Sequence, residues 1–121
     1  SRNLKILKLR NCNLETLDIN FLDFSNFARL EYLDLSFNKL EQISSQTTSS
    51  FRMIRSLILS YNHISLFGLT RTLRLSLIDL SFNRLNNFTN TLFLPSESPK
   101  IIINNNKINN ITIDSFKDFI N

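Results

Sequence analysis

The sequence predicts an α/β solenoid, in which short repeats stack to form a parallel β-sheet on one side and loops or short helices on the other. Two observations predict it. A segment of the same pattern recurs five times in the 121 residues. Inside each copy, apolar residues alternate with variable ones, as in a half-buried strand. The chain also holds one Gly, one Cys and one His, which excludes glycine-rich phosphate loops, internal disulfides and cysteine-based zinc sites.

The five copies begin at residues 4, 30, 54, 75 and 98, so successive starts are 26, 24, 21 and 23 residues apart. They read LKILKLRNCNL, LEYLDLSFNKL, IRSLILSYNHI, LSLIDLSFNRL and SPKIIINNNKI. The first four fit L-x-x-L-x-L-x-x-N/C-x-L with Ile allowed for Leu, and the fifth misses only the first position. One such unit cannot bury its own apolar face, so we expect the copies to stack around a continuous core.

One short strand is expected in each copy, because the two apolar side chains of L-x-L point to one face and the variable residue points to the other. The strand centres are expected near Lys8, Asp34, Ile58, Asp79 and Ile102.

A position that holds Asn in four copies and Cys in the first follows each strand, where the chain turns into the interior. A buried turn leaves backbone N–H and C=O groups without partners, and an amide side chain supplies donors and an acceptor that can bridge neighbouring coils. The expected ladder consists of Cys12, Asn38, Asn62, Asn83 and Asn106. For the thiol, this position favours a buried, reduced structural role over a reactive group or a bond outside the segment.

The outer side of the coils is expected to hold bulky aromatic residues. Phe27, Phe51 and Phe116 each stand three residues before an apolar repeat position. The coils that carry Thr72 or Pro95 in this region are expected to be irregular there.

The polar tract SSQTTSS at 44–50 keeps the repeat spacing on both sides of it. We interpret it as a loop on the convex side, with a modified or glycosylated segment as the alternative.

On these residues, the chain resembles the leucine-rich repeat family over nearly all of its length. The repeat spacing and the Phe positions are similar to the typical extracellular class, as in Toll-like and chaoptin-like ectodomains. The resemblance implies a right-handed solenoid with a short-stranded parallel sheet on the concave face and mostly loops and short helices on the convex side. It also implies protein ligands on the concave face or its edges.

Residues 1–121 are interpreted as one domain of five repeats and a partial sixth, taken from a longer array. Phe116 and Phe119 open the sixth repeat, which stops before its strand. The alternative is a short intact protein whose last apolar residues close the final coil.

The outward-facing strand positions and the position before each Asn form the expected partner-binding surface. Contiguous exposed apolar residues mark interaction sites, and charged neighbours set specificity. The candidates are Lys8, Tyr32, Asp34, Phe37, Ile58, Tyr61, Leu77, Asp79, Phe82, Lys100 and Ile102, with Ile6 in the same columns. For the three candidates before an Asn, the alternative is a stacked rim that only covers the turn.

Charge gives no sign of a nucleic-acid or membrane-surface protein, because the 14 Lys and Arg and the 10 Asp and Glu are scattered along the chain. The basic column Lys39, His63, Arg84 and Lys107 is interpreted as solvated side chains. The chain contains no apolar run long enough to span a membrane. No metal or other cofactor is expected.

The sequence therefore favours a non-catalytic protein-recognition module of a secreted or cell-surface receptor or adhesion protein, with a protein ligand or co-receptor. An intracellular adaptor or regulatory subunit is one alternative. A structural role, in which exposed sheet edges pair with a second chain, is another. Glycosylation sequons at Asn87 and Asn110 permit secretion without arguing for it.

Overall fold

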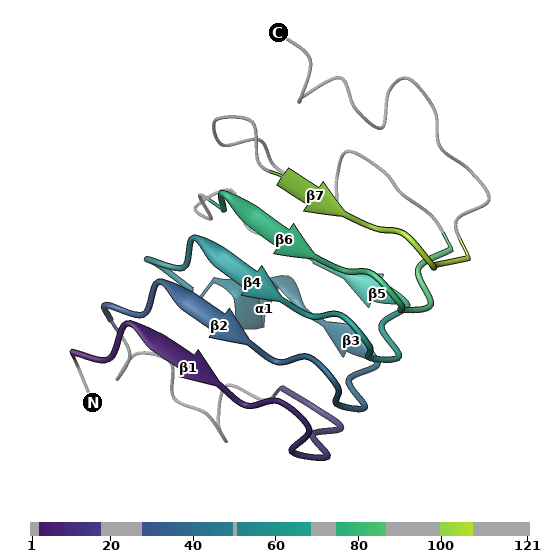
Figure 1. The fold of residues 1–121 in the computed structure, drawn as a ribbon, viewed down its shortest axis with the longest axis horizontal. Coiled ribbons are helices and arrows are strands. Elements are labelled where there is room, and N and C mark those ends of the chain that lie inside the picture. The colour runs from purple at the N-terminus through teal and green to yellow at the C-terminus, as the bar shows by residue number, and fades with distance from the viewer. Residues whose placement is uncertain (1–2, 18–27, 50, 69–74, 87–99, 108–121) are drawn as a thin grey trace, which may run out of the picture.

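The computed structural model describes residues 3–17, 28–49, 51–68, 75–86 and 100–107. Within these ranges, each repeat contributes one strand to the same side of the molecule (Figure 1). The connection from β2 (Tyr32–Asp34) to β4 (Ser56–Ile58) passes behind the sheet in this view. Because both arrows point to the lower right and β4 lies above β2, this crossover is right-handed. The described part of the chain is thus a solenoid of stacked coils, as the repeat pattern predicts.

Five parallel strands form the main sheet, in the order β1-β2-β4-β6-β7. They are β1 (Ile6–Lys8), β2 (Tyr32–Asp34), β4 (Ser56–Ile58), β6 (Leu77–Asp79) and β7 (Lys100–Ile102). Their pairing keeps one register, with the middle residue of each strand opposite the middle residue of the next. Each strand centre lies one residue before the expected position, because the inward-facing Leu or Ile, and not the variable residue after it, is in the middle of the paired segment.

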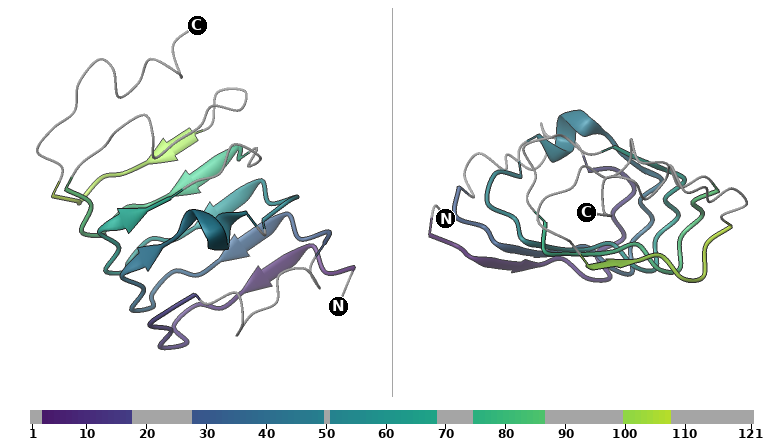
Figure 2. Two further views of the ribbon diagram at one scale, coloured as in Figure 1. Left: turned by 180° about the vertical axis from the view of Figure 1, so that it is seen from behind. Right: turned by 90° about the horizontal axis from the view of Figure 1, so that it is seen from above.

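A smaller layer lies behind the main sheet (Figure 2). It contains the parallel pair β3 (Gln42–Ile43) and β5 (Leu66–Phe67), together with the one-turn helix α1 (Ser45–Thr48). The sequence analysis did not identify this pair of strands, since two residues are too few to show a period. The solenoid therefore has a sheet on each side of its core across the second and third coils.

The core between these layers is a column of Leu and Ile side chains. Leu33 and Leu57, at the centres of β2 and β4, are both fully buried. Phe51 enters from the convex side and is 2% exposed, in line with its expected role there. Leu7 and Ile101, in the first and last strands, are only partly buried, because each has a described coil on one side alone. The expected convex residues Phe27, Thr72, Pro95 and Phe116 lie outside the described residues.

The side chain of Asn62 joins two coils and completes its own turn. Its Nδ2 donates to the carbonyl of Leu35 in the preceding coil at 3.0 Å and to that of Leu59 in its own coil at 3.1 Å. Its Oδ1 accepts a bond from the backbone N–H of Leu40 at 3.0 Å. One amide thus supplies partners to buried backbone groups that the short strands leave unpaired.

The same bridge recurs along the solenoid. The amide Oδ1 of each rung accepts from the coil before it, and its Nδ2 donates to the carbonyl at the end of the preceding strand. The other rungs that make these bonds are Asn38, Asn83 and Asn106. Among the described residues, every buried side-chain nitrogen or oxygen has a hydrogen-bond partner. The polar side chains in the interior of this part of the chain, those of the ladder included, are thus all hydrogen-bonded.

The first rung differs from the expectation. Cys12 is exposed, so the prediction of a buried thiol is wrong. Its Sγ lies 3.4 Å from the carbonyl oxygen of Arg10 in the same turn, while its backbone N–H donates to Asn38 Oδ1 at 3.0 Å. Cys12 belongs to the first coil, and no described coil precedes that coil and covers it. A thiol also lacks the second donor hydrogen that an Asn amide uses to bridge two coils.

The polar tract at 44–50 also differs from the expectation, since part of it is helix α1 and not a loop. The Ser44 hydroxyl accepts a bond from the N–H of Thr47 at 3.1 Å and so caps the helix. The hydroxyls of Thr47 and Thr48 are buried and donate to the carbonyls of Leu17 and Gly68, each at 3.1 Å. The tract therefore ties the second coil to the coils on both sides of it.

The ladder predicts a large loss of stability in Asn62→Ala. Removing the amide leaves buried N–H and C=O groups without partners, and we expect the free energy of unfolding to fall by about 3 kcal/mol. Urea unfolding followed by circular dichroism measures this change. Asn104→Ala is the control, because Asn104 is exposed and lies on the turn of the last described coil, and we expect a change below about 0.5 kcal/mol. Equal effects of the two substitutions would contradict the role of the amide.

Candidate functional site

An aromatic residue occupies the turn after each of the three central strands of the main sheet. Phe37, Tyr61 and Phe82 have φ angles of 58°, 58° and 55°. This left-handed region is unfavourable for a residue with a bulky side chain, by roughly 1 kcal/mol. At the equivalent turn positions, Asn11 and Asn105 have φ angles of 54° and 58°, and Asn tolerates this conformation better. The turn geometry therefore does not explain why three of its positions hold aromatic residues.

These three aromatic residues form a continuous stack, which we call the aromatic stack. The ring centroids of Phe37 and Tyr61 are 4.4 Å apart, those of Tyr61 and Phe82 are 4.2 Å apart, and both pairs are tilted by only 7°. The side chains are 43%, 43% and 39% exposed. The spacing follows the distance between adjacent parallel strands, which is about 4.8 Å. The stack is thus an ordered apolar ridge in contact with solvent.

Two of the turns are held by a carboxylate from the end of the preceding strand. Asp34 Oδ1 accepts bonds from the backbone N–H and the hydroxyl of Ser36, at 2.9 and 2.6 Å. Asp79 makes the same pair of bonds to Ser81, at 3.0 and 2.6 Å. Asp34 is 6% exposed, so the expectation that it offers a charge to a partner is wrong, and Asp79 is half-buried. Both carboxylates orient the turns that carry the aromatic residues.

Arg10 extends the stack into the first coil, and the sequence analysis missed it. Its guanidinium carbon lies 5.3 Å from the ring centroid of Phe37, within cation–π distance. Its Nε donates to Ser36 Oγ at 3.2 Å and lies 3.7 Å from Asp34 Oδ2. A signal was present in the aligned repeats, because Arg10 occupies the column that holds Ser in the next three copies. A cation in that column lies next to the neighbouring coil's aromatic residue.

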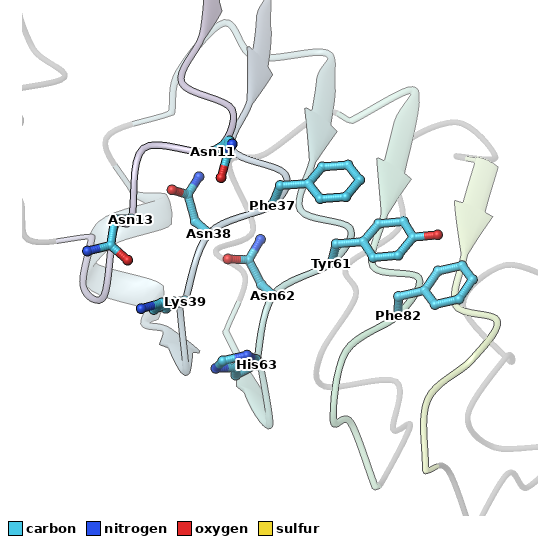
Figure 3. A pocket seen from close by; sticks show the side chains of 9 residues that line it. All are labelled: Asn11, Asn13, Phe37, Asn38, Lys39, Tyr61, Asn62, His63 and Phe82. Carbon is cyan, nitrogen blue, oxygen red and sulfur yellow. The ribbon is translucent and has the colours of Figure 1, made fainter.

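A groove of about 400 Å³ runs beside the stack, and we call it the rim groove. Figure 3 shows the three rings on one side, Lys39 and His63 on the other, and the amides of Asn38 and Asn62 between them. The full lining is Asn11, Asn13, Phe37, Asn38, Lys39, Tyr61, Asn62, His63 and Phe82. The groove lies at the turns that follow the strands, and not over the middle of the main sheet.

The remaining candidate residues lie on the outward face of the strands. Ile6 is 58% exposed, and Lys8 and Lys100 are also exposed. Lys8 Nζ lies 5.8 Å from the ring centroid of Tyr32, which is half-buried. The other half-buried candidates on this face are Ile58, Leu77 and Ile102. None of these strand residues lines the rim groove, so the structure divides the predicted surface into a strand face and a rim.

Neither a metal site nor a membrane-spanning helix is found in the described ranges of the chain. Within these ranges, no group of three or more His, Cys, Asp and Glu could hold a metal ion. The helix in the described part of the chain is too short to cross a membrane. The sequons at Asn87 and Asn110 lie outside the described residues.

Comparisons with known proteins agree with the repeat pattern. A family model described as Leucine rich repeat matches residues 2–64. Tsukushi from Gallus gallus is 38% identical over 60 residues, which are 50% of this chain and 16% of that protein. The chain thus spans about a sixth of the relative's length. No solved structure matches the chain.

The opposing contributions at Phe82 predict a small effect of Phe82→Asn on stability. The substitution loses one ring stack, worth about 1 kcal/mol, and relieves a left-handed backbone cost of similar size. We expect the free energy of unfolding to change by less than about 1 kcal/mol. Leu80→Ala, two residues earlier and fully buried, is the comparison and should lose about 3 kcal/mol. Urea unfolding of both variants measures the difference. A loss of unfolding free energy in Phe82→Asn as large as that in Leu80→Ala would show that the ring stabilises the fold as a core residue does.

Proposed function

Because the chain belongs to the leucine-rich repeat family, whose domains bind other proteins, we propose that it is a non-catalytic protein-recognition module that uses the aromatic stack and the rim groove. The observation that carries this proposal is the exposure of Phe37, Tyr61 and Phe82 in left-handed turns. Exposed, contiguous aromatic surface is unfavourable in water and marks interaction sites.

The stack has the properties of a binding anchor. Aromatic residues and Arg dominate the energetic centres of protein interfaces, and this ridge contains three rings with Arg10 at one end. The rings pack against each other before any partner arrives, so little side-chain entropy is lost on binding. The Asp34 and Asp79 carboxylates support this preorganisation by holding two of the turns.

The strand face supplies the second part of the proposed surface. A protein that contacts the rim can also reach the adjacent outward side chains of the sheet. We assign this role to Lys8, Tyr32, Ile58, Leu77, Asp79, Lys100 and Ile102. The exposed charges of Lys8 and Lys100 would set orientation, and the half-buried apolar residues would add contact area.

We propose an extracellular setting, as part of a secreted or cell-surface receptor or adhesion protein. The resemblance of the repeat spacing and the convex Phe positions to the extracellular class supports this setting. One observation favours an intracellular adaptor or regulatory subunit as the second candidate. Cys12 is a free and exposed thiol, which is common in reducing compartments and less so in secreted proteins.

Selection from a phage-displayed library of random peptides tests the proposal without a known partner. We expect the wild-type chain to select clones whose binding falls at least about tenfold in Tyr61→Asn, a change of about 1.4 kcal/mol. Asn at this position reproduces the residue at the equivalent turns of the first and fifth copies, so the backbone is retained. Biolayer interferometry on the selected peptides measures the change.

The control is Leu66→Asn, which removes an apolar side chain that is 64% exposed in β5, on the layer behind the main sheet. Peptide binding should be unchanged in this variant. A library that yields no binding clone, or clones that bind Tyr61→Asn as tightly as the wild type, would contradict the proposed function.

A further inference from the structure

We infer that the rim groove receives an acidic segment of a partner protein, an inference that rests on the proposed function and names the chemistry of its ligand. The groove contains no carboxylate among its nine lining residues. It contains the ammonium of Lys39 and the imidazole of His63 on one side. The amides of Asn11 and Asn13 add further donors at one end. A carboxylate that enters the groove thus meets donors and positive charge without an opposing acid in the lining.

The aromatic wall has the same electrostatic preference. Because the rings of Phe37, Tyr61 and Phe82 stack at 4.2–4.4 Å, both faces of Tyr61 and one face each of Phe37 and Phe82 are covered by a neighbouring ring, which leaves mainly ring edges for a ligand to contact. The edge of an aromatic ring carries partial positive charge, whereas its face carries partial negative charge. A stack seen from its edges is therefore apolar and weakly attractive to anions, in contrast to a single ring that offers its face to a cation.

The nearest carboxylates on the strands are directed to other partners. Asp34 and Asp79 accept bonds from Ser36 and Ser81, and Asp34 also lies against Arg10. Glu41 is exposed two residues after Lys39, but it does not line the groove. Asp34 and Asp79 thus serve the turns, while Glu41 and the equivalent exposed Glu15 lie outside the lining, which contains no carboxylate.

The basic wall continues along the solenoid beyond the groove. Arg84 and Lys107 occupy the column of Lys39 and His63 in the next two coils, and both are exposed. The backbone N–H groups of His63, Arg84 and Lys107 donate to the preceding coil at 2.8, 2.9 and 2.9 Å in equivalent bonds. The column is thus repeated at the spacing of adjacent strands, about 4.8 Å. An extended acidic segment can follow it along the axis of the solenoid.

The mixture of surfaces favours a protein over a sulfated polysaccharide. Lys39 is the one Lys or Arg in the lining, while three aromatic residues form the opposite wall. A sulfated chain would leave those ring edges without apolar contacts. A peptide that places apolar or aromatic side chains beside Asp or Glu matches both walls.

Binding of synthetic copolymers to the whole chain tests the inference. The probes are a random copolymer of glutamate and tyrosine, a copolymer of lysine and tyrosine, and heparin as a sulfated polysaccharide. We expect the glutamate–tyrosine copolymer to bind the wild type, and Lys39→Glu to weaken this binding at least about fivefold. Raising the salt concentration should weaken it as well, since exposed charges are screened.

Lys5→Glu is the matched control, because it makes the same change of charge at an exposed Lys at the opposite end of β1 from the groove. It should alter binding by less than about twofold, and urea unfolding verifies that both variants are folded. Equal weakening by the two substitutions would show a general charge effect and overturn the inference.

Two further outcomes would also overturn it. Preference for the lysine–tyrosine copolymer would reverse the assigned charge, and binding of heparin alone would assign the groove to a polysaccharide. These failures are separable from failure of the proposed function. Library peptides that depend on Tyr61 but carry no excess of Asp or Glu would leave protein recognition standing and remove only the acidic ligand.

Discussion

The hydrogen bonds that the Asn side chains make between coils are the constraint on which the rest of the molecule depends. Strands of three residues leave most of each coil without ladder partners, and a buried turn needs them. Asn38, Asn62 and Asn83 each bond to their own strand end and to the coil before. Each amide makes the same bonds to its own coil and to the coil before it. The repeated bonds therefore keep the distance and the register between adjacent coils constant. The apolar column is then packed by repetition of one arrangement.

This constant register also creates the aromatic stack. A residue placed directly before each Asn must recur at the separation of adjacent coils, so aromatic residues there meet face to face at 4.4 and 4.2 Å. The backbone bonds from Phe37 to Ser60 and from Tyr61 to Ser81, both 3.1 Å, repeat the same geometry beside the amides. The candidate binding surface is thus an outward consequence of the interactions that hold the interior.

The repeat pattern predicted what the coils share, and it could not predict what differs between neighbours. The five strands and the positions of the Asn rungs follow from the common motif. The contact of Arg10 with Phe37 joins unlike residues of adjacent coils, so no single copy contains it. The alternation along a strand predicts the face from which a side chain leaves the backbone. It does not predict that the Asp34 carboxylate turns to accept a bond from Ser36, so the burial of Asp34 was not predicted. Cys12 was misplaced because its burial depends on a further coil, which lies outside the repeat itself.

In each turn, the fold depends on the Asn position, whereas the candidate site depends on the residue directly before it. The Asn rung is required inside every described turn but the first, where Cys12 stands. The position before it tolerates Asn, as Asn11 and Asn105 show with the same left-handed backbone. The turn therefore does not need Phe37, Tyr61 or Phe82 for its conformation. The cost of the left-handed backbone at each of these residues is about as large as the stabilisation from ring stacking. Since the interior of the described coils does not need these rings and water disfavours them, their exposure supports the proposal of a bound partner at the rim.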